Sequence, residues 1–168
     1  AEDPGQRPLQ KRLAKEVKNR LMFFIRGEDL TEALEVQIKK ALLRFRREVS
    51  PDIEIVFASM NRKKDEITAL KLSDAMPFPT NRLLFTSGQK LSWAIASSKI
   101  VVSSRLHALI TAASANRPFV ALCHDPKLEA FAKECMLPQK LYPSLSSCDL
   151  ETKLFEALKC AFCEAQKI

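Results

Sequence analysis

The sequence predicts a doubly wound α/β domain, in which a parallel sheet lies between two layers of helices. Short apolar runs of strand length alternate with longer segments whose apolar residues recur every three or four positions. The connections between these segments are short, which favours successive βαβ units with right-handed crossovers. The length of 168 residues fits a single domain.

The expected strands are continuous apolar runs, which are typical of strands buried on both faces of a parallel sheet. The first run, at 21–25, is followed by Gly27, and the second, at 53–58, follows a turn at 50–52. The five expected strands are 21–25, 53–58, 82–85, 99–102 and 118–122.

The expected helices have one apolar face and recognisable ends. Acidic residues follow Thr31 in the first turn of one helix, and Pro126 opens another, where its missing N–H costs nothing. The six expected helices are 30–48, 61–74, 87–97, 105–116, 126–135 and 149–165. Residues 1–19 are polar and predict a flexible lead-in or a short helix, so the expected domain is 20–168.

The charge, the cysteine count and the apolar runs of the chain limit the ligands and the cellular location that we expect. The net charge of +7 is spread over both halves of the chain, which argues against nucleic acid. It indicates an ordinary basic surface, with attraction to anionic substrates or an anionic membrane face as the alternative. An odd count of five cysteines and no secretory leader predict free thiols in the cytoplasm. The C-x-x-C pair of Cys160 and Cys163 has no second ligand pair, so we expect no metal, and no apolar run is long enough to span a membrane.

Parallel sheets bind ligands beyond the carboxyl ends of their strands, so the residues that follow each strand carry the functional prediction. Ser103 and Ser104 are good N-cap residues, and Arg105 and His107 fall in the first turn of the next helix. Free amides, a helix dipole, a guanidinium and an imidazole together suit a phosphate or a carboxylate. The alternative is that Arg105 is a surface cation and His107 a core histidine.

The junction after the fifth strand adds a second candidate cluster. Lys127 lies at a helix start, where a cation is unfavourable for the dipole, which favours a functional role over that of an ordinary solvated lysine. Asp125 before Pro126 is typical of a structural N-cap.

Three segments together resemble the polysaccharide pyruvyltransferase family. The family pattern is an R-L-H-A-L helix start, a short G-V-P-F-V strand and a Y-D-P-K-V-x-x-F segment. Here it corresponds to segments 101–113, 117–122 and 125–132. Arg105, His107 and Lys127 fall on its positions. Arg26 resembles the arginine after the first strand, and 59–61 with Asp65 resembles the P-M-Q…D segment. His124 departs from the family's Tyr and Ser104 from its Met.

The resemblance implies a Rossmann-like C-terminal domain, the donor-side half of a GT-B-like two-domain enzyme. It implies transfer of a pyruvyl group from phosphoenolpyruvate to a sugar of a cell-surface polysaccharide or its lipid-linked precursor, forming a ketal. His107 would be the catalytic acid, and Arg105, Lys127, Ser104 and Arg26 would bind the donor. Phosphoenolpyruvate is then a substrate, so no cofactor is expected.

The partners implied by the resemblance are phosphoenolpyruvate, a glycan or lipid-linked acceptor and an N-terminal domain. The location implied is the cytoplasm, with the inner membrane face left open. Two alternatives stay open: the donor domain of a sugar-nucleotide-dependent glycosyltransferase, and a non-catalytic binding module that keeps the fold.

Overall fold

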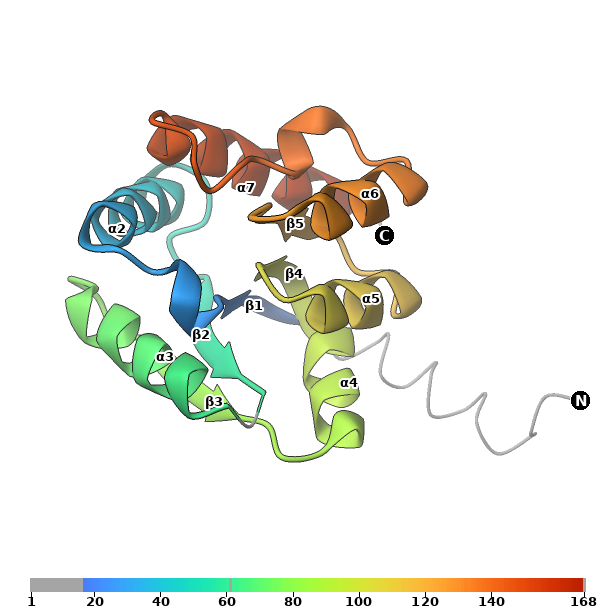
Figure 1. Ribbon diagram of the computed structural model, residues 1–168, viewed down its shortest axis with the longest axis horizontal. Helices are drawn as coiled ribbons and strands as arrows, with labels where there is room; N and C mark the ends of the chain where they lie inside the picture. The colour runs from blue at the N-terminus through green and yellow to red at the C-terminus, as the bar shows by residue number, and fades with distance from the viewer. Residues whose placement is uncertain (1–16, 61, 168) are drawn as a thin grey trace, which may run out of the picture.

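The computed structural model describes residues 17–60 and 62–167 and contains the predicted sheet (Figure 1). Every pair of neighbouring strands runs in parallel, in the order β3-β2-β1-β4-β5. The strands are β1 (Lys18–Phe24), β2 (Glu54–Ser59), β3 (Asn81–Leu84), β4 (Ser98–Ser103) and β5 (Phe119–Ala121). The five expected strands are therefore confirmed, with bounds that differ by a few residues at most.

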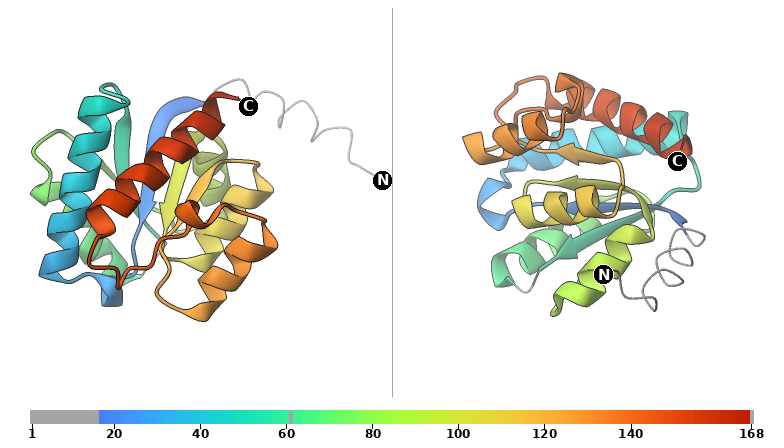
Figure 2. Two further views of the ribbon diagram at one scale, coloured as in Figure 1. Left: turned by 90° about the horizontal axis from the view of Figure 1, so that it is seen from above. Right: turned by 90° about the vertical axis from the view of Figure 1, so that its right-hand side faces the viewer.

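Helices cover both faces of the sheet, so the three-layer doubly wound fold is confirmed (Figure 2). Buried residues of α2, α3 and α7 join the core on one face, and those of α4, α5 and α6 join the core on the other. The α-helices are α2 (Glu32–Glu48), α3 (Lys63–Ala75), α4 (Gly88–Ala96), α5 (Leu106–Ser114), α6 (Pro126–Glu134) and α7 (Leu150–Gln166). Two 3-10 turns, η1 (Gly27–Asp29) and η2 (Gln139–Leu141), were not expected.

The central strand β1 shows why its apolar run has no polar alternation. Leu21 and Phe23 pack into the core beneath α2 and α7, while Met22 and Phe24 pack into the core beneath α4, α5 and α6. All four side chains are at most 1% exposed. A strand buried on both faces must be apolar at every position.

The start of the chain is the main difference from the expected domain bounds. Lys18 and Asn19 already belong to β1, because Lys18 donates its amide to the carbonyl of Ser97 and so extends the pairing with β4. Residues 1–16 of the lead-in expected at 1–19 lie outside the described residues. Among helices of residues 17–60 and 62–167, none combines the length and apolar character that a membrane crossing requires.

The strand order places a topological switch point between β1 and β4. The chain leaves β1 for a helix on one face of the sheet and leaves β4 for a helix on the other, so the two connections separate there. A crevice at such a point is the usual ligand site of an open parallel sheet. The loops after β1 and β4 are therefore the first place to look for a site.

Candidate functional site at the switch point

The loops that follow β1 and β4 are joined through Ser104. Its amide donates to the carbonyl of Phe24 at 3.0 Å, and its hydroxyl accepts from the amide of Arg26 at 2.8 Å. Ser104 is 1% exposed. The structure thus brings together two predicted site residues, Ser104 and Arg26, and gives the serine hydroxyl a partner within the protein.

The predicted capping role of the two serines is wrong. The N-cap of α5 is Arg105, which makes no side-chain cap hydrogen bond. The hydroxyl of Ser103 instead accepts from the amide of Arg105 at 2.8 Å, while that of Ser104 is held by Arg26. Since the first amides of a helix have no partner within it, the start of α5 keeps amides that a ligand can use.

Arg105 makes a two-pronged ion pair with Asp65 of α3. Its Nε donates to Oδ2 and its Nη2 to Oδ1, both at 2.8 Å, and the side chains are 15% and 3% exposed. Asp65 also accepts from the amide of Gly27 at 2.9 Å, and Glu28 lies 3.7 Å from the guanidinium. Arg105 is therefore not a surface cation.

A guanidinium has five N–H donors, of which Asp65 takes two. The pair therefore fixes the orientation of Arg105 and leaves donors on the same group for a ligand. The role of Asp65 was missed from sequence, although this residue is part of the family-like segment. A buried acid amid polar helix residues gives no periodic signal of its own.

His107 and Lys127 are both exposed, each at the second position of its helix. The alternative of a core histidine is thus wrong for His107. Within the described residues, no ion pair or side-chain hydrogen bond joins either of them to Arg105. Their convergence on one ligand stays a prediction, as does the donor-binding role of every site residue.

Arg26 is held by the acidic turn η1. Its Nε and Nη2 donate to the two carboxylate oxygens of Asp29 at 3.2 and 2.9 Å, and Glu28 lies 3.9 Å away. The hydrogen bond to Asp29 is the largest of the effects that raise the pKa of Arg26 above its usual value. Both arginines of the switch point are therefore paired with carboxylates.

His124 connects the junction after β5 to the switch point. Its Nε2 lies 2.9 Å from the carbonyl oxygen of Ser104, and its Nδ1 lies 3.3 Å from a carboxylate oxygen of Asp125. Asp29 is 3.9 Å from the same ring. The residue that departs from the family's Tyr therefore keeps a polar partner at this place.

Asp125 is the N-cap of α6, as its interpretation as a structural cap predicted. Its carboxylate accepts from the amides of Lys127 at 2.8 Å and Leu128 at 3.2 Å. Partial burial raises the pKa of Asp125, but the two amides and the nearby His124 and Arg26 outweigh it and bring it below the usual value. The carboxylate is therefore charged at neutral pH.

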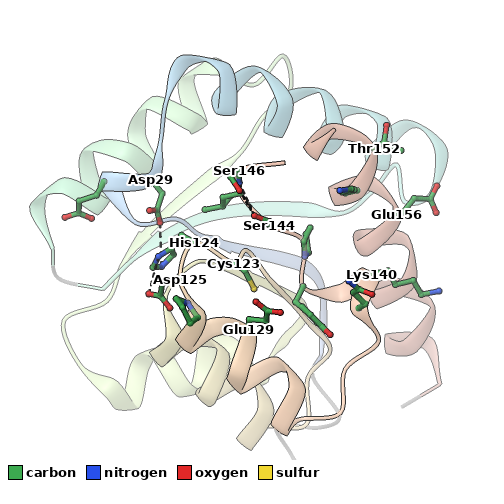
Figure 3. Close-up of a pocket in the computed structure, with 17 residues that line it drawn as sticks. Asp29, Cys123, His124, Asp125, Glu129, Lys140, Ser144, Ser146, Thr152 and Glu156 are labelled. Atoms are coloured by element: carbon green, nitrogen blue, oxygen red, sulfur yellow. Dashed lines mark hydrogen bonds and ion pairs between the residues drawn. The ribbon is translucent and has the colours of Figure 1, made fainter. Parts of the chain in front are cut away.

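A pocket of about 1000 Å³ lies next to the switch point, between η1, the start of α6, η2 and α7 (Figure 3). His124 and Asp125 line it, together with Glu28 and Asp29 of η1. Its remaining walls come from 139–146 and the first half of α7, where no sequence pattern indicated a function. Arg26, Ser104, Arg105, His107 and Lys127 are not among the lining residues.

The five cysteines of the chain are all free. Cys123 lies in the pocket wall, and burial, followed by the charges of Glu129 and Asp125, raises the pKa of its thiol to about 11. Among the described residues, no group of three or more histidine, cysteine or acidic side chains is placed to hold a metal ion.

Solved structures match the fold over nearly the whole chain. The S. aureus MnaA protein, in a structure with UDP, has 14% identity and a TM-score of 0.60, over 95% of this chain and 40% of that one. The spinosyn rhamnosyltransferase SpnG has 13% identity and a TM-score of 0.52, over 91% and 38%. The chain therefore spans about two fifths of the length of these proteins.

The strand order and these likenesses define a Rossmann-like α/β domain. The model of the polysaccharide pyruvyl transferase family matches a shorter segment, residues 80–126. This match confirms the resemblance to that transferase family. Ser104, Arg105 and His107 lie inside the matched segment, Lys127 directly follows it, and Arg26 lies outside. No curated protein matches the chain.

Proposed function

We propose that the chain is the donor-binding half of an enzyme that transfers a pyruvyl group from phosphoenolpyruvate to a sugar. The observation that carries this proposal is Arg105, which is fixed by Asp65 beside an uncapped helix start and inside the family-matched segment. A doubly anchored guanidinium next to free amides is a preorganised site for a carboxylate or a phosphate.

The proposed reaction consumes the enol of phosphoenolpyruvate and two hydroxyls of one sugar. A proton adds to the methylene carbon, the adjacent carbon becomes oxocarbenium-like, and one hydroxyl adds to it. The second hydroxyl then displaces the phosphate, which leaves a cyclic ketal and inorganic phosphate. Each hydroxyl loses its proton in forming its C–O bond; one of these protons replaces the proton that was added to carbon, and the other leaves with the phosphate. The site must therefore bind two anionic groups and supply one proton.

His107 is the residue that we assign to the proton. It is exposed on the first turn of α5, directly after Arg105 and Leu106, so its ring can reach a ligand held at the helix start. Histidine is the side chain whose ordinary titration lies nearest to neutral pH. Lys127, exposed at the start of α6, is assigned to the phosphate.

Ser104 and Arg26 act mainly by position in this proposal. The hydroxyl of Ser104 holds the amide of Arg26, and Asp29 holds its guanidinium, so both residues fix the loop beside Arg105. The acceptor is a glycan or lipid-linked sugar, and a second domain completes the cleft, because the chain spans about two fifths of its structural neighbours.

A titration of phosphoenolpyruvate by calorimetry at low salt tests the proposal. We expect His107→Ala and Arg105→Lys each to weaken binding about tenfold, as for the loss of one charge-assisted hydrogen bond. Lys127→Ala should act likewise, whereas Lys133→Ala, an exposed lysine of the same helix, should leave binding unchanged. Absence of binding to the wild type, or equal losses in all variants, contradicts the proposal.

A sugar-nucleotide donor is the second candidate, favoured by the likeness in fold to a protein solved with UDP. It calls for the same anion site but also for partners of a base and a ribose. A thermal shift by UDP that exceeds the shift by phosphoenolpyruvate would favour this candidate over pyruvyl transfer.

A further inference from the structure

The pocket beside the switch point has no role in donor binding as proposed above. Figure 3 shows its walls: η1, the start of α6, the segment that follows η2, and α7. Its volume of about 1000 Å³ is at the upper end of the range for small-molecule sites. It is large enough for one or two sugar rings.

The wall formed by 143–146 is built as an extension of the sheet. Cys123 donates its amide to the carbonyl of Pro143 at 3.0 Å and accepts from the amide of Leu145 at 2.9 Å, so this segment runs parallel to the end of β5. The hydroxyls of Ser144 and Ser146 lie 2.8 Å apart. The pocket is thus preformed, with hydroxyl groups along a fixed strand-like edge.

The lining of the pocket carries more acidic than basic side chains. Acidic residues outnumber lysines in the lining: Glu28, Asp29, Asp125, Glu129 and Glu156 are acidic, whereas Lys140 and Lys153 are basic. Arg26 pairs with Asp29 and Lys133 with Glu129, which offsets part of this excess. No ion pair involves Glu156 among the described residues, so its carboxylate is open to hydrogen bonds from uncharged hydroxyls. Tyr142 adds an aromatic side chain with a polar tip.

The pocket and the proposed donor site share a wall. Glu28 of the pocket lies 3.7 Å from the guanidinium of Arg105, and His124 lies 2.9 Å from the carbonyl of Ser104. One layer of side chains therefore separates an anionic pocket from the cationic helix start. Glu28 and His124 therefore border both the pocket and the loops that carry the start of α5.

We propose that this pocket is a subsite for an uncharged sugar residue of the acceptor glycan. The inference rests on the proposed function in that the sugar is assigned to the acceptor. That the pocket binds an uncharged sugar is inferred from the pocket lining alone. The acid-rich lining keeps phosphoenolpyruvate out, and the serine edge and the carboxylates bind hydroxyls. The anionic donor thus binds at the cationic start of α5, and the uncharged acceptor sugar binds in the acid-rich pocket of the same domain.

Amide NMR spectra of the chain, titrated separately with the methyl glycosides of galactose, mannose and N-acetylglucosamine at tens of millimolar, test the inference. We expect at least one glycoside to shift the amides of Ser144, Ser146 and Lys153. Glu156→Gln should weaken that binding about fivefold, the difference between a charged and a neutral acceptor. Glu164→Gln, on the same helix but outside the pocket, should bind as the wild type does.

The two proposals fail separately in these spectra. If none of the three glycosides shifts the pocket amides, or if phosphoenolpyruvate shifts them, the sugar subsite is wrong. If a glycoside shifts the pocket amides while phosphoenolpyruvate leaves the start of α5 unchanged, the subsite stands and pyruvyl transfer fails. If a glycoside binds Glu156→Gln as tightly as it binds the wild type, the carboxylate does not bind the sugar and the inference is overturned.

Discussion

Removal of the Asp65 carboxylate is the perturbation whose effect on folding follows most directly from the structure. Asp65→Ala deletes two charge-assisted hydrogen bonds from Arg105 and one from the amide of Gly27. It leaves a guanidinium whose side chain is only 15% exposed without its main partner. Removal of one partner of a buried ion pair usually lowers the free energy of unfolding by about 3–5 kcal/mol.

The expected loss lies at the lower end of that range. Glu28 lies 3.7 Å from the same guanidinium and can partly replace Asp65. We therefore expect Asp65→Ala to lower the free energy of unfolding by about 3 kcal/mol, which for a chain of this size lowers the Tm by roughly 6–12 °C. Asp65→Asn keeps an oxygen for Gly27 and should cost about half as much.

Urea unfolding followed by circular dichroism measures these differences. The matched control is Glu48→Ala, which removes an exposed partner of Arg44 and should cost less than about 0.5 kcal/mol. The double variant Asp65→Ala/Arg105→Ala should lose about 2 kcal/mol less than the sum of the two single losses, because it leaves no unpaired buried charge. A loss below about 1 kcal/mol for Asp65→Ala, or simple additivity, would refute the reasoning.

Four further predictions concern other parts of the fold. Gly27→Ala should destabilise the chain by about 1–3 kcal/mol in urea unfolding, because its Cβ would lie 2.7 Å from that of Lys64 and 2.9 Å from its backbone; an unchanged midpoint would contradict this. Met136→Gly should stabilise it by about 1 kcal/mol, since this exposed residue after α6 has a φ of 58°; a lower Tm would count against it. Burial raises the pKa of Glu54, but hydrogen bonds from Arg20 and Asn81 outweigh this effect and lower the folded-state pKa. The ionised Glu54 therefore stabilises the fold above the unfolded-state pKa of about 4.3, and this stabilisation is lost as the pH falls through the folded-state pKa. Glu54→Gln should accordingly lower the free energy of unfolding at neutral pH and match the wild type well below about pH 4. Mass spectrometry after iodoacetamide treatment at mildly alkaline pH should find exposed Cys148 modified well before half-buried Cys123, whose pKa is about 11; comparable rates would contradict the raised pKa of Cys123.

The fold could be predicted from the sequence because its signals are local and repeated. The apolar run of β1 and the Pro126 start of α6 both fix an element type over a few residues. The handedness and spacing of βαβ units then predict a parallel sheet, whereas its strand order was not predicted. The 3-10 turn at Gly27–Asp29 could not be predicted, since acidic residues after a strand have no periodicity.

The site could be predicted only in part. The junctions after β1 and β4, both of which carry predicted site residues, meet in the structure, and Ser104 and Arg26 share a hydrogen bond across them. The partner of Arg105 is Asp65, 40 residues away, and such a pairing depends on tertiary packing that no local pattern encodes. The pocket walls at 139–146 and on α7 were missed for the same reason.

The central claim is that phosphoenolpyruvate binds at the start of α5, and amide NMR of the wild type measures this most directly. We predict that saturating phosphoenolpyruvate shifts the amides of Leu106, His107 and Ala108 and leaves those of Ser144 and Ser146 in place. Shifts confined to other parts of the chain, or larger shifts of the α5 amides by UDP than by phosphoenolpyruvate, would contradict the claim.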